Sequence, residues 1–533
     1  MNPWAGFPVP AMRLEALHGD RVVRCFVERP KSFYAMLARA AAERPDAPAL
    51  VCEGRSWTYA QTHAEVERVA ASLAARGIAR GDRVGLLIPN RPEFVFVLFA
   101  LQRLGAVAVP IGVREQRPGL AYMLGQCGAK GIVFDADLAE RIPDQSEAPG
   151  VTLRAQIGGA VFAAPAGAPP PVAEVHEHDA AVILYTSGTT GKPKGAVLTH
   201  LNIAHSVLHY EACMRLGADE RSALAVPASH VTGLIATIAS MAHVGGTVVV
   251  MPEFKAPAFI ELVERERITH TLMVPAMYNL CLLAPDFGRR DLSSWRVGGY
   301  GGAPMPVATI DALARHLPNL VLVNTYGATE TTSPTTMMPA GRTRDHADTV
   351  GVPLPCVQVL VMDDEGREAA PGEAGELWIG GPMVVPGYWD NAEASATSFT
   401  AGFWHSGDFG SIDAEGFVRI LDRKKDMLNR GGFKIYSVEV ENALMGFDGV
   451  LEAAIVAREC PVLGERVHAV LHAPGVEHND AKVRDHCRKL LADYKVPETI
   501  TWSDTPLPRN ANGKVLKRLL RESAVAAGAA KGR

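Results

Sequence analysis

The residues of this chain that are best suited to binding a charged ligand lie in the segment 185–195, Tyr-Thr-Ser-Gly-Thr-Thr-Gly-Lys-Pro-Lys-Gly. Its eleven positions contain four aliphatic hydroxyls, three glycines and two lysines. Glycine lets a backbone turn tightly and bring its N–H groups close to an anion. The hydroxyls add neutral hydrogen-bond donors, and the lysines add positive charge. This combination predicts a loop that binds a polyphosphate.

Two common nucleotide-binding motifs do not describe this segment. A P-loop needs four residues between its first glycine and its Gly-Lys pair, and then Ser or Thr. Here two residues separate Gly188 from Gly191, and Pro193 follows Lys192. The glycine-rich run 298–302 lacks the spacing of a Rossmann fingerprint. A plain surface turn is the alternative interpretation of such a Gly/Ser/Thr cluster.

Two further stretches could hold a nucleotide. Residues 301–304, Gly-Gly-Ala-Pro, are small enough for a flat base to approach the backbone. Residues 324–330, Asn-Thr-Tyr-Gly-Ala-Thr-Glu, offer an aromatic face, a hydroxyl and a carboxylate for a hard cation. A turn and the end of a strand are the respective alternatives.

Three more stretches in the last third of the chain carry charged side chains. Trp-His-Ser-Gly-Asp at 404–408 supplies a carboxylate that can accept hydrogen bonds from two vicinal hydroxyls. A charged run lies at 422–426, Asp-Arg-Lys-Lys-Asp, and Gly431-Gly432 follows it. The third stretch is 508–514, Pro-Arg-Asn-Ala-Asn-Gly-Lys, in which an Asn-Gly turn would present the lysine at the tip of a loop. The alternatives are a turn residue, a solvated charge run and a solvated tail lysine.

Together, in this order, the six motifs resemble those of the adenylate-forming superfamily of acyl-CoA synthetases, aryl-CoA ligases, luciferases and peptide-synthetase adenylation domains. The resemblance covers nearly the whole chain. It implies that a carboxylate attacks the α-phosphate of ATP to form an acyl-adenylate, and that a thiol then displaces AMP. The implied cofactors are ATP, Mg²⁺ and coenzyme A.

The resemblance also implies a role for individual residues. Tyr326 would stack on adenine, Asp408 would bind the ribose with Arg423 as its partner, and Ser406 stands where the family usually has Thr. The implied catalytic residues are Lys514, Glu330, Thr186 and His230, of which Thr186 and Glu330 would also hold the metal. The implied nucleotide- and cofactor-binding residues are Thr186, Ser187, Gly188, Thr189, Thr190, Lys194, Gly302, Ala303, Asn324, Tyr326, Gly327, Thr329, Asp408, Arg423, Lys425, Gly431, Gly432 and Lys514.

Adenylation and thioester formation take place in one site, so the protein must change conformation between them. By resemblance, Lys425 is the pivot of a swinging small domain, Lys514 contacts the carboxylate and the α-phosphate during adenylation, and Gly431-Gly432 lines the thiol tunnel afterwards. The predicted fold is α/β, with a large N-terminal domain of parallel αβα sheets and a small β-rich subdomain, followed by a small mobile α+β domain. The predicted boundaries are 1–422 for the large domain, 423–426 for the hinge and 427–533 for the small domain.

The acid pocket is predicted from the segment around His230, which by resemblance gates the acyl site or lies near the thiol. A buried structural histidine is the alternative. Amino-acid-activating relatives have an Asp in this segment, and residues 227–233 contain none. The implied substrate residues are His230, Gly233, Tyr300 and Gly301, and the predicted wall, which adds Leu234, Ala236, Met277 and Gly299, is apolar and suits a fatty or aromatic acid.

Only 19 residues follow Lys514, so we expect no carrier-protein domain after it and favour free coenzyme A as acceptor. The alternative function is that of a stand-alone adenylating enzyme that loads a carrier protein. A further alternative is a luciferase-like oxygenase, and the non-enzymatic alternative is a nucleotide-binding sensor. Lys514 together with Glu330 and Asp408 argues against a pure binder.

Composition predicts a globular protein that does not bind nucleic acid. The chain has 533 residues, 48% hydrophobic and 21% charged, with a net charge of −5 and no basic run. Its eight scattered cysteines include no CxxC pair, which is typical of reduced thiols in the cytoplasm. Residues 231–252 lack charge, but Gly245-Gly246 interrupts them, so a buried helix-turn-strand is expected rather than a membrane span. We expect a monomer or a homodimer.

Hydrophobic periodicity places the motifs on elements. Strands and helices alternate from 84 to 274, which predicts parallel sheets covered by helices. Helices are expected over 33–48 and over 60–76, with Thr58 as a cap. Short strands split by Gly, Pro and Asp follow after about 350, and 437–502 has the pattern of a compact α+β unit.

Overall fold

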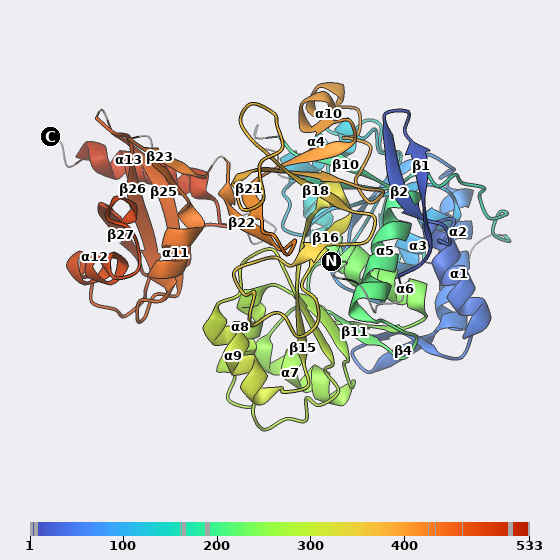
Figure 1. Ribbon diagram of the computed structural model, residues 1–533. Coiled ribbons are helices and arrows are strands. Elements are labelled where there is room, and N and C mark those ends of the chain that lie inside the picture. Colours follow the sequence, from blue (N-terminus) through green and yellow to red (C-terminus); the bar gives the residue numbers. More distant parts are fainter. Residues whose placement is uncertain are drawn as a thin grey trace. The chain divides into compact units, whose positions relative to one another are not determined.

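The computed structural model describes residues 4, 9–159, 161–162, 167–186, 192–424, 426–431, 433–460, 462–509 and 515–530, with the backbone alone over 524–530. Contacts divide the chain into two compact units (Figure 1). The large unit comprises Met1–Val359, Trp378–His405 and Glu415–Val418, and the small unit comprises Leu360–Leu377, Ser406–Ala414 and Arg419–Arg533.

The large unit contains a six-stranded sheet of the order β10-β9-β6-β5-β7-β8. Its strands are β10 (Lys194–Thr199), β9 (Ala180–Thr186), β6 (Val107–Pro110), β5 (Arg83–Leu87), β7 (Gly131–Phe134) and β8 (Leu153–Gln156). All neighbours are parallel except β9 and β10, which form an antiparallel pair. The segment predicted to bind phosphates connects these two strands.

A nine-stranded sheet of the order β17-β16-β15-β14-β13-β11-β12-β3-β4 lies in the same unit. Its strands are β17 (Val352–Pro353), β16 (Ser333–Met337), β15 (Val321–Ala328), β14 (Val297–Tyr300), β13 (His270–Met273), β11 (Arg221–Leu224), β12 (Thr247–Val250), β3 (Pro48–Cys52) and β4 (Arg55–Thr58). The six strands from β15 to β3 run parallel, and the outer pairs are antiparallel. Along β12 and beyond, Val248 and Val250 pack into one core, while Val249 and Met251 pack into another. Both faces are therefore covered, as is typical of parallel sheets.

Helices cover these sheets, and Figure 1 shows α7, α8 and α9 beside the part of the nine-stranded sheet near β15. The helical segments of the large unit are α1 (Phe33–Glu43), α2 (Tyr59–Ala75), α3 (Pro92–Arg103), α4 (Arg117–Gln126), η1 (Ala136–Arg141), α5 (His200–Met214), η2 (Thr232–Ala239), α6 (Ser240–Val244), α7 (Ala256–Arg265), α8 (Pro275–Leu283), α9 (Val307–His316), η3 (Thr329–Thr331) and α10 (Ala392–Ser398). Helix α3 contacts strands of both sheets, and 11 of its 12 residues are buried. A helix that is apolar on every side belongs in such a core.

Helix caps follow the sequence closely. Thr58 accepts a hydrogen bond from the Gln61 N–H in a capping box, so its predicted role at the start of α2 is confirmed. Thr199 and Asn202 form a second capping box on α5. The Asn202 amide also donates to the carbonyls of Pro382 (2.7 Å) and Val384 (3.2 Å), which joins α5 to a distant loop.

The uncharged stretch 231–252 is the predicted buried helix-turn-strand. It contains η2, α6 and β12, and Gly245 ends α6 with φ +76° in the left-handed region. Within the described part of the chain, no helix combines the length and apolar character that a membrane span requires.

One sequence prediction about the large unit was wrong, and one of its elements was missed. The helix expected over 33–48 ends at Glu43, because Pro48 begins strand β3, which pairs with β4. The hairpin of β1 (Met12–Leu17) and β2 (Arg21–Phe26) was missed, because its residues have no regular alternation of buried and exposed positions.

A five-stranded sheet has the order β18-β19-β21-β20, with β22 paired to β21, and its residues are divided between the two units. It contains β18 (Gln358–Met362), β19 (Gly375–Gly380), β21 (Phe403–Ile412), β20 (Phe399–Thr400) and β22 (Val418–Arg423). The predicted β-rich region after about 350 is therefore confirmed.

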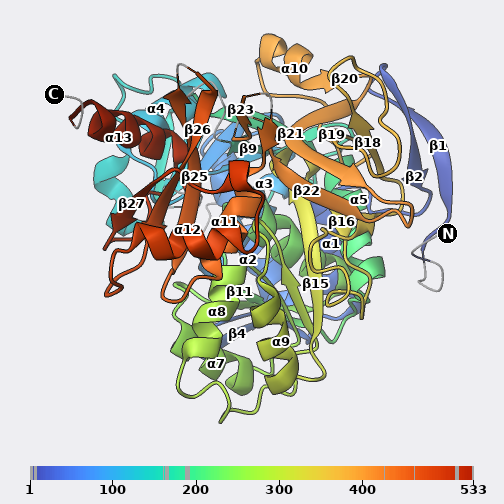
Figure 2. The ribbon, with the colours of Figure 1, turned by 60° about the vertical axis from the view of Figure 1, so that its left-hand side comes forward.

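The small unit has its own sheet, of the order β24-β23-β26-β25 with β27 beside β26 (Figure 2). Its elements are β23 (Leu428–Arg430), β24 (Phe433–Ile435), α11 (Ser437–Met445), β25 (Glu452–Cys460), β26 (Gly464–His472), α12 (Asp480–Arg488), η4 (Asp493–Lys495), β27 (Thr499–Ser503) and α13 (Lys517–Ala530). A core that includes Leu428, Val440, Val467 and Val483 lies within it. The predicted α/β class is confirmed.

Candidate active site

Three predicted motifs of the large unit lie where parallel strands end. Strand β9 ends at Thr186, β14 at Tyr300 and β15 at Ala328. Ligands of α/β sheets bind in the crevice outside the carboxyl ends of the strands. Strands β14 and β15 are neighbours in the nine-stranded sheet, whereas β9 belongs to the six-stranded sheet, and a contact between Thr186 and Glu330 joins the two groups of motifs.

Thr186 and Glu330, the predicted metal-holding pair, are in contact. The Thr186 hydroxyl donates to Glu330 Oε1 at 3.2 Å, and Glu330 is only 7% exposed. The same oxygen accepts a hydrogen bond from the hydroxyl of Tyr388 at 2.9 Å. Burial, the nearby Glu330 carboxylate and the hydrogen bond to it raise the pKa of Tyr388, so its hydroxyl stays protonated and donates.

Lys194 is the first residue of β10 and pairs with Thr186 across the β9–β10 hairpin. Its ammonium nitrogen lies 5.0 Å from the centre of the Tyr388 ring, which is within the range of a cation–π contact. The cluster of Thr186, Lys194, Glu330 and Tyr388 thus combines a hydroxyl, an ammonium, a carboxylate and a phenol. Tyr388 was not among the predicted site residues.

The glycines predicted beside the nucleotide are sites of close backbone approach. A Cβ on Gly301 would lie 2.3 Å from the carbonyl oxygen of Thr325, and one on Gly327 would lie 2.4 Å from that of Ser333. Gly302 has φ +79° in the left-handed region, and Ala303 beside it is exposed. The chain just after β14 therefore approaches β15 closely at Gly301, and β15 approaches β16 closely at Gly327, where a side chain would meet backbone atoms.

The motif 324–330 has three buried residues, Asn324, Thr325 and Glu330, and four that are half-buried or exposed. The Asn324 amide donates to the carbonyl of Thr349 at 3.1 Å and is buried, so it supports the loop before β17. Tyr326 and Thr329 are half-buried, and Tyr326 packs beside Met383 and Trp404. Tyr326 is thus a half-buried aromatic residue that packs against an apolar cluster.

His230 lies just before η2, where its Nδ1 is 3.1 Å from the Thr232 hydroxyl. Burial lowers the pKa of His230, so it is neutral near pH 7. A Cβ on Gly233 would lie 2.4 Å from the carbonyl oxygen of Pro227, which explains the glycine at this turn. Tyr300 is 1% exposed and belongs to the core on the α7–α9 side of the sheet.

The small unit brings together two of the predicted residues. Arg423 Nε lies 3.3 Å from Asp408 Oδ1, so the predicted pairing is present. Gly431 has φ +59°, and its N–H donates to the carbonyl of Leu463 at 2.7 Å. Residues before and after the predicted Lys514 loop are joined by a hydrogen bond, in which the Leu516 N–H donates to the Pro508 carbonyl at 2.7 Å.

Several predicted residues lie outside the described residues, so their contacts stay predictions. They are Ser187, Gly188, Thr189 and Thr190 of the phosphate segment, Lys425 of the hinge, Gly432, and Lys514.

The donors present fit the implied metal and nucleotide. A nearly buried carboxylate beside a hydroxyl is an oxygen donor set of the kind that Mg²⁺ prefers, and a lysine at the end of the adjoining strand suits a phosphate.

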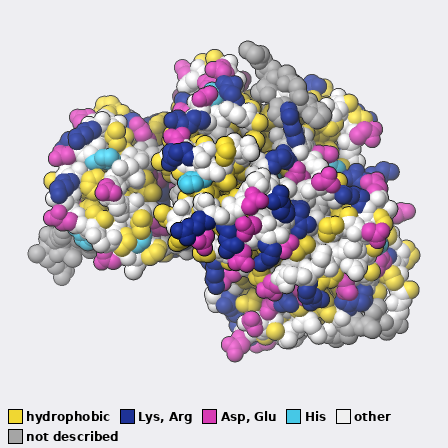
Figure 3. All heavy atoms as spheres, turned by 90° about the horizontal axis from the view of Figure 1, so that it is seen from below, with side chains coloured by type: hydrophobic (Ala, Val, Ile, Leu, Met, Phe, Trp, Pro, Cys, Tyr) yellow, Lys and Arg dark blue, Asp and Glu magenta, His cyan; other side chains and the backbone are white. Residues whose placement is uncertain are grey.

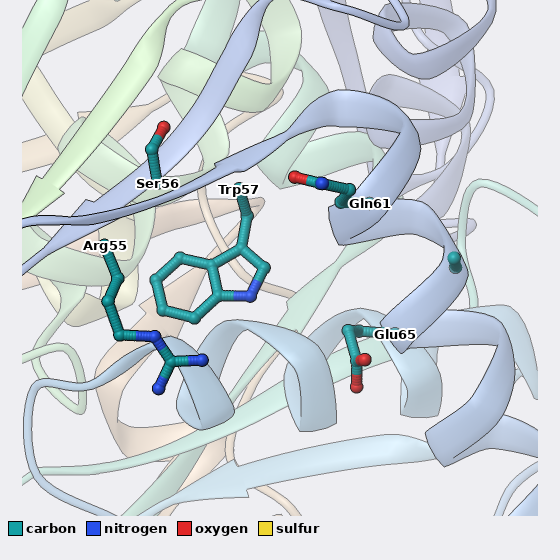
Figure 4. Close-up of a pocket in the computed structure, with 6 residues that line it drawn as sticks. Arg55, Ser56, Trp57, Gln61 and Glu65 are labelled. Carbon is teal, nitrogen blue, oxygen red and sulfur yellow. The ribbon is translucent and has the colours of Figure 1, made fainter.

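An open pocket of about 310 Å³ lies elsewhere, between β4 and α2. Figure 4 shows the Arg55 side chain beside the ring of Trp57, with Gln61 and Glu65 contributed by α2. None of its lining residues is a predicted site residue, so we do not assign the site to it. On the face shown in Figure 3, basic and acidic side chains are interspersed, which agrees with the balanced composition.

Comparisons with known proteins agree with the geometry. The family model "AMP-binding enzyme" matches residues 37–389, and the model "AMP-binding enzyme C-terminal domain" matches residues 439–514. The chain is 35% identical to feruloyl-CoA synthase of Amycolatopsis sp over 487 residues, 90% of this chain and 96% of that protein. It is also 35% identical to the long-chain-fatty-acid–CoA ligase FadD13 of Mycobacterium tuberculosis over 471 residues, 87% and 92% of the two chains.

Among solved structures, o-succinylbenzoate CoA synthetase from Bacillus subtilis, in complex with its acyl-adenylate intermediate, matches with a TM-score of 0.84 and 28% identity. The match covers 93% of this chain and 99% of that one. The chain therefore belongs to the adenylate-forming superfamily and is an AMP-forming acid–thiol ligase that uses ATP, Mg²⁺ and coenzyme A.

Proposed function

We propose that the acid whose acyl group this ligase transfers to coenzyme A is a fatty or aromatic carboxylic acid. The observation that carries this proposal is the chemistry of residues 227–239, which contain no acidic side chain for a substrate ammonium. Leu234 and Ala236 are fully buried and apolar there, and the neutral His230 adds no charge. The similar feruloyl-CoA synthase and long-chain-fatty-acid–CoA ligase support an aromatic or an aliphatic acid, respectively.

In the adenylation step, a carboxylate oxygen forms a bond to the α-phosphorus of ATP while the bond to pyrophosphate breaks. Both reactants are anions, so positive charge must gather at the reacting phosphate. We assign this role to Lys514, with Lys194 and the hydroxyl of Thr186 at the leaving phosphates. Glu330 and Thr186 would hold Mg²⁺, which supplies charge neutralisation at the phosphates when bound.

We assign the nucleoside to residues of two motifs. The Tyr326 ring would stack on adenine, with Gly302, Ala303, Asn324 and Gly327 around the base. Asp408 would accept hydrogen bonds from both ribose hydroxyls, and its 3.3 Å contact with Arg423 would hold the carboxylate in place. Thr329 and the segment 187–190 would contact the phosphates.

In the second step, the thiolate of coenzyme A forms a bond to the acyl carbon, and AMP leaves. We propose that residues 1–422 bind ATP and the acid, that 423–426 are the hinge, and that 427–533 rotate about Lys425 between the steps. Gly431 and Gly432 would then approach the thiol in place of Lys514. The left-handed φ of Gly431 supports a tight turn at this loop.

The test is a panel of acids, graded by chain length and ring type, in which pyrophosphate release is measured with and without coenzyme A. We expect release that depends on the acid, and acyl-CoA detected by mass spectrometry when coenzyme A is present. A sensor would release no pyrophosphate with any acid. A carrier-loading enzyme would form the adenylate but leave coenzyme A unacylated, and a luciferase-like oxygenase would consume oxygen.

We also propose a cytoplasmic protein that works as a monomer or homodimer. Support for the compartment comes from the eight cysteines, all of them free thiols, of which seven are buried. Sedimentation of the purified protein would test the oligomeric state.

A further inference from the structure

One short segment of the large unit holds both the backbone and the side chain of Glu330. The Val385 N–H donates to the Glu330 carbonyl at 3.0 Å. Three residues later, the Tyr388 hydroxyl donates to Glu330 Oε1 at 2.9 Å. Glu330 is therefore held at its backbone carbonyl and at one carboxylate oxygen, which limits the rotation of its side chain.

Tyr388 is itself fixed by its surroundings. Its N–H donates to the Ser395 hydroxyl at 2.9 Å, and its ring packs edge-on against Phe399 with a centroid distance of 5.8 Å. On either side of it, the Gly387 carbonyl accepts from Val197 N–H at 3.1 Å and the Trp389 N–H donates to the Gly195 carbonyl at 2.7 Å. The segment is therefore attached to β10, the strand that begins with Lys194.

The same side chain orients a second charged group. Lys194 Nζ lies 5.0 Å from the centre of the Tyr388 ring, while the hydroxyl of Tyr388 reaches Glu330. Tyr388 is 9% exposed and Glu330 is 7% exposed, so the hydrogen bond between them is shielded from water and is stronger than it would be on the surface, while Lys194 is half-buried.

We propose that Tyr388 is a positioning residue for adenylation, whose hydroxyl holds the Glu330 carboxylate in the orientation that binds the metal–ATP complex and whose ring holds Lys194 towards the phosphates. This inference rests on the proposed role of Glu330. Hydrogen-bond partners of metal-binding side chains fix their orientation, and their loss typically weakens metal binding by 10- to 100-fold.

The test separates the hydroxyl from the ring. Tyr388→Phe removes only the hydroxyl, so we expect Mn²⁺ binding in the presence of ATP, measured by electron paramagnetic resonance, to weaken about tenfold. The Mg²⁺ concentration that half-saturates pyrophosphate release should rise by a similar factor, while the rate at saturating Mg²⁺ stays near that of the parent. Tyr388→Leu also removes the ring, and should in addition raise the KM for ATP.

Tyr59→Phe is the matched control. Its buried hydroxyl donates to the carbonyls of Met241 and Gly246, away from the predicted site, so this variant should keep the Mn²⁺ affinity of the parent. A rate loss in Tyr388→Phe that is equal at every Mg²⁺ concentration would point to a folding defect and overturn the inference. Unchanged Mn²⁺ binding in Tyr388→Phe would overturn it as well.

Glu330→Gln distinguishes this failure from that of the proposed function. If Glu330→Gln weakens Mn²⁺ binding and Tyr388→Phe does not, the inference about Tyr388 alone is wrong. If both variants bind Mn²⁺ as the parent does, the assignment of Glu330 to the metal is wrong too.

Discussion

Replacing Gly301 with Ala should disable adenylation, because the new methyl group has no room. Its Cβ would lie 2.3 Å from the Thr325 carbonyl oxygen, and ordinary contact begins at 3.4 Å, so the two strands must separate by about 1.1 Å. The atom in the way is backbone of β15, one residue before Tyr326, so no side-chain rotation relieves the contact.

The expected magnitude follows from that displacement. Overpacking of a tight interior costs about 1–3 kcal/mol of stability. A shift of about 1 Å in a group that positions a substrate can lower the rate by roughly 100-fold. Since Tyr326 is the proposed adenine-stacking residue, we expect kcat/KM for ATP to fall by about 100-fold, while most of the protein remains folded.

The assay is pyrophosphate release at varied ATP, with thermal unfolding measured in parallel. Gly217→Ala is the control, because a Cβ there has no neighbour within 4 Å and the backbone is not left-handed. Gly302→Ala is a graded comparison, since its Cβ would be 3.8 Å from Val274 but its φ of +79° adds strain. A Gly301→Ala enzyme with the parent's kcat/KM would refute the claim that this close approach shapes the nucleotide site.

Three further predictions concern the tail lysine, acid stability and a buried amide. Lys514→Ala should slow acid-dependent pyrophosphate release about 100-fold or more, yet leave thiolysis of a supplied acyl-adenylate nearly intact. Equal losses in the two half-reactions would contradict the proposed role of Lys514 in adenylation alone. Burial lowers the pKa of His205 to about 4 and those of His209 and His270 to about 3. Histidine in the unfolded chain titrates near pH 6.5, so below that pH the unfolded chain binds more protons than the folded one. The urea midpoint of unfolding should therefore fall steadily from about pH 6.5 towards pH 4. A midpoint that is constant over this range would count against the burial of these rings as neutral groups. Asn202→Ala removes the Asn202 half of the α5 capping box and two buried hydrogen bonds to carbonyls, and should cost about 2–4 kcal/mol, visible as a lower thermal midpoint. An unchanged midpoint would show that water replaces the amide.

The sequence predicted the fold well where a local signal was strong. The α2 cap at Thr58 and the break at Gly245 both appear in the structure, because each depends on residues within a few positions. The strand β3 was missed for the opposite reason. Pro45 and Pro48 end the helical stretch before it, but its five residues show no alternation of polar and apolar positions, and pairing with β12 and β4 makes them a strand.

The site was predicted in part, and the missing part has a clear cause. Thr186 and Glu330 were paired by resemblance, and their 3.2 Å contact joins residues 144 positions apart. Tyr388 carries no signal of its own, since a Gly-Tyr-Trp triplet is typical of many turns. Its importance arises from two contacts, one with Glu330, 58 positions earlier, and one with the strand β10. Only the fold brings these segments together.

The described residues at the two ends of the phosphate segment, Tyr185 and Pro193, are held by contacts with helix α4. At the start of the segment, the Tyr185 hydroxyl contacts the Met123 carbonyl and the Gln126 amide oxygen, and at its end the Pro193 carbonyl accepts from the Tyr122 hydroxyl at 3.2 Å. Gln126 also donates to the Trp389 carbonyl at 2.7 Å, so helix α4 links the segment to the residue after Tyr388. Both ends of the segment and the Glu330 carboxylate are therefore held by contacts within the protein itself. Groups that are already oriented need little reorganisation when charge develops at a phosphate, and this is the condition under which electrostatic stabilisation of a transition state is largest.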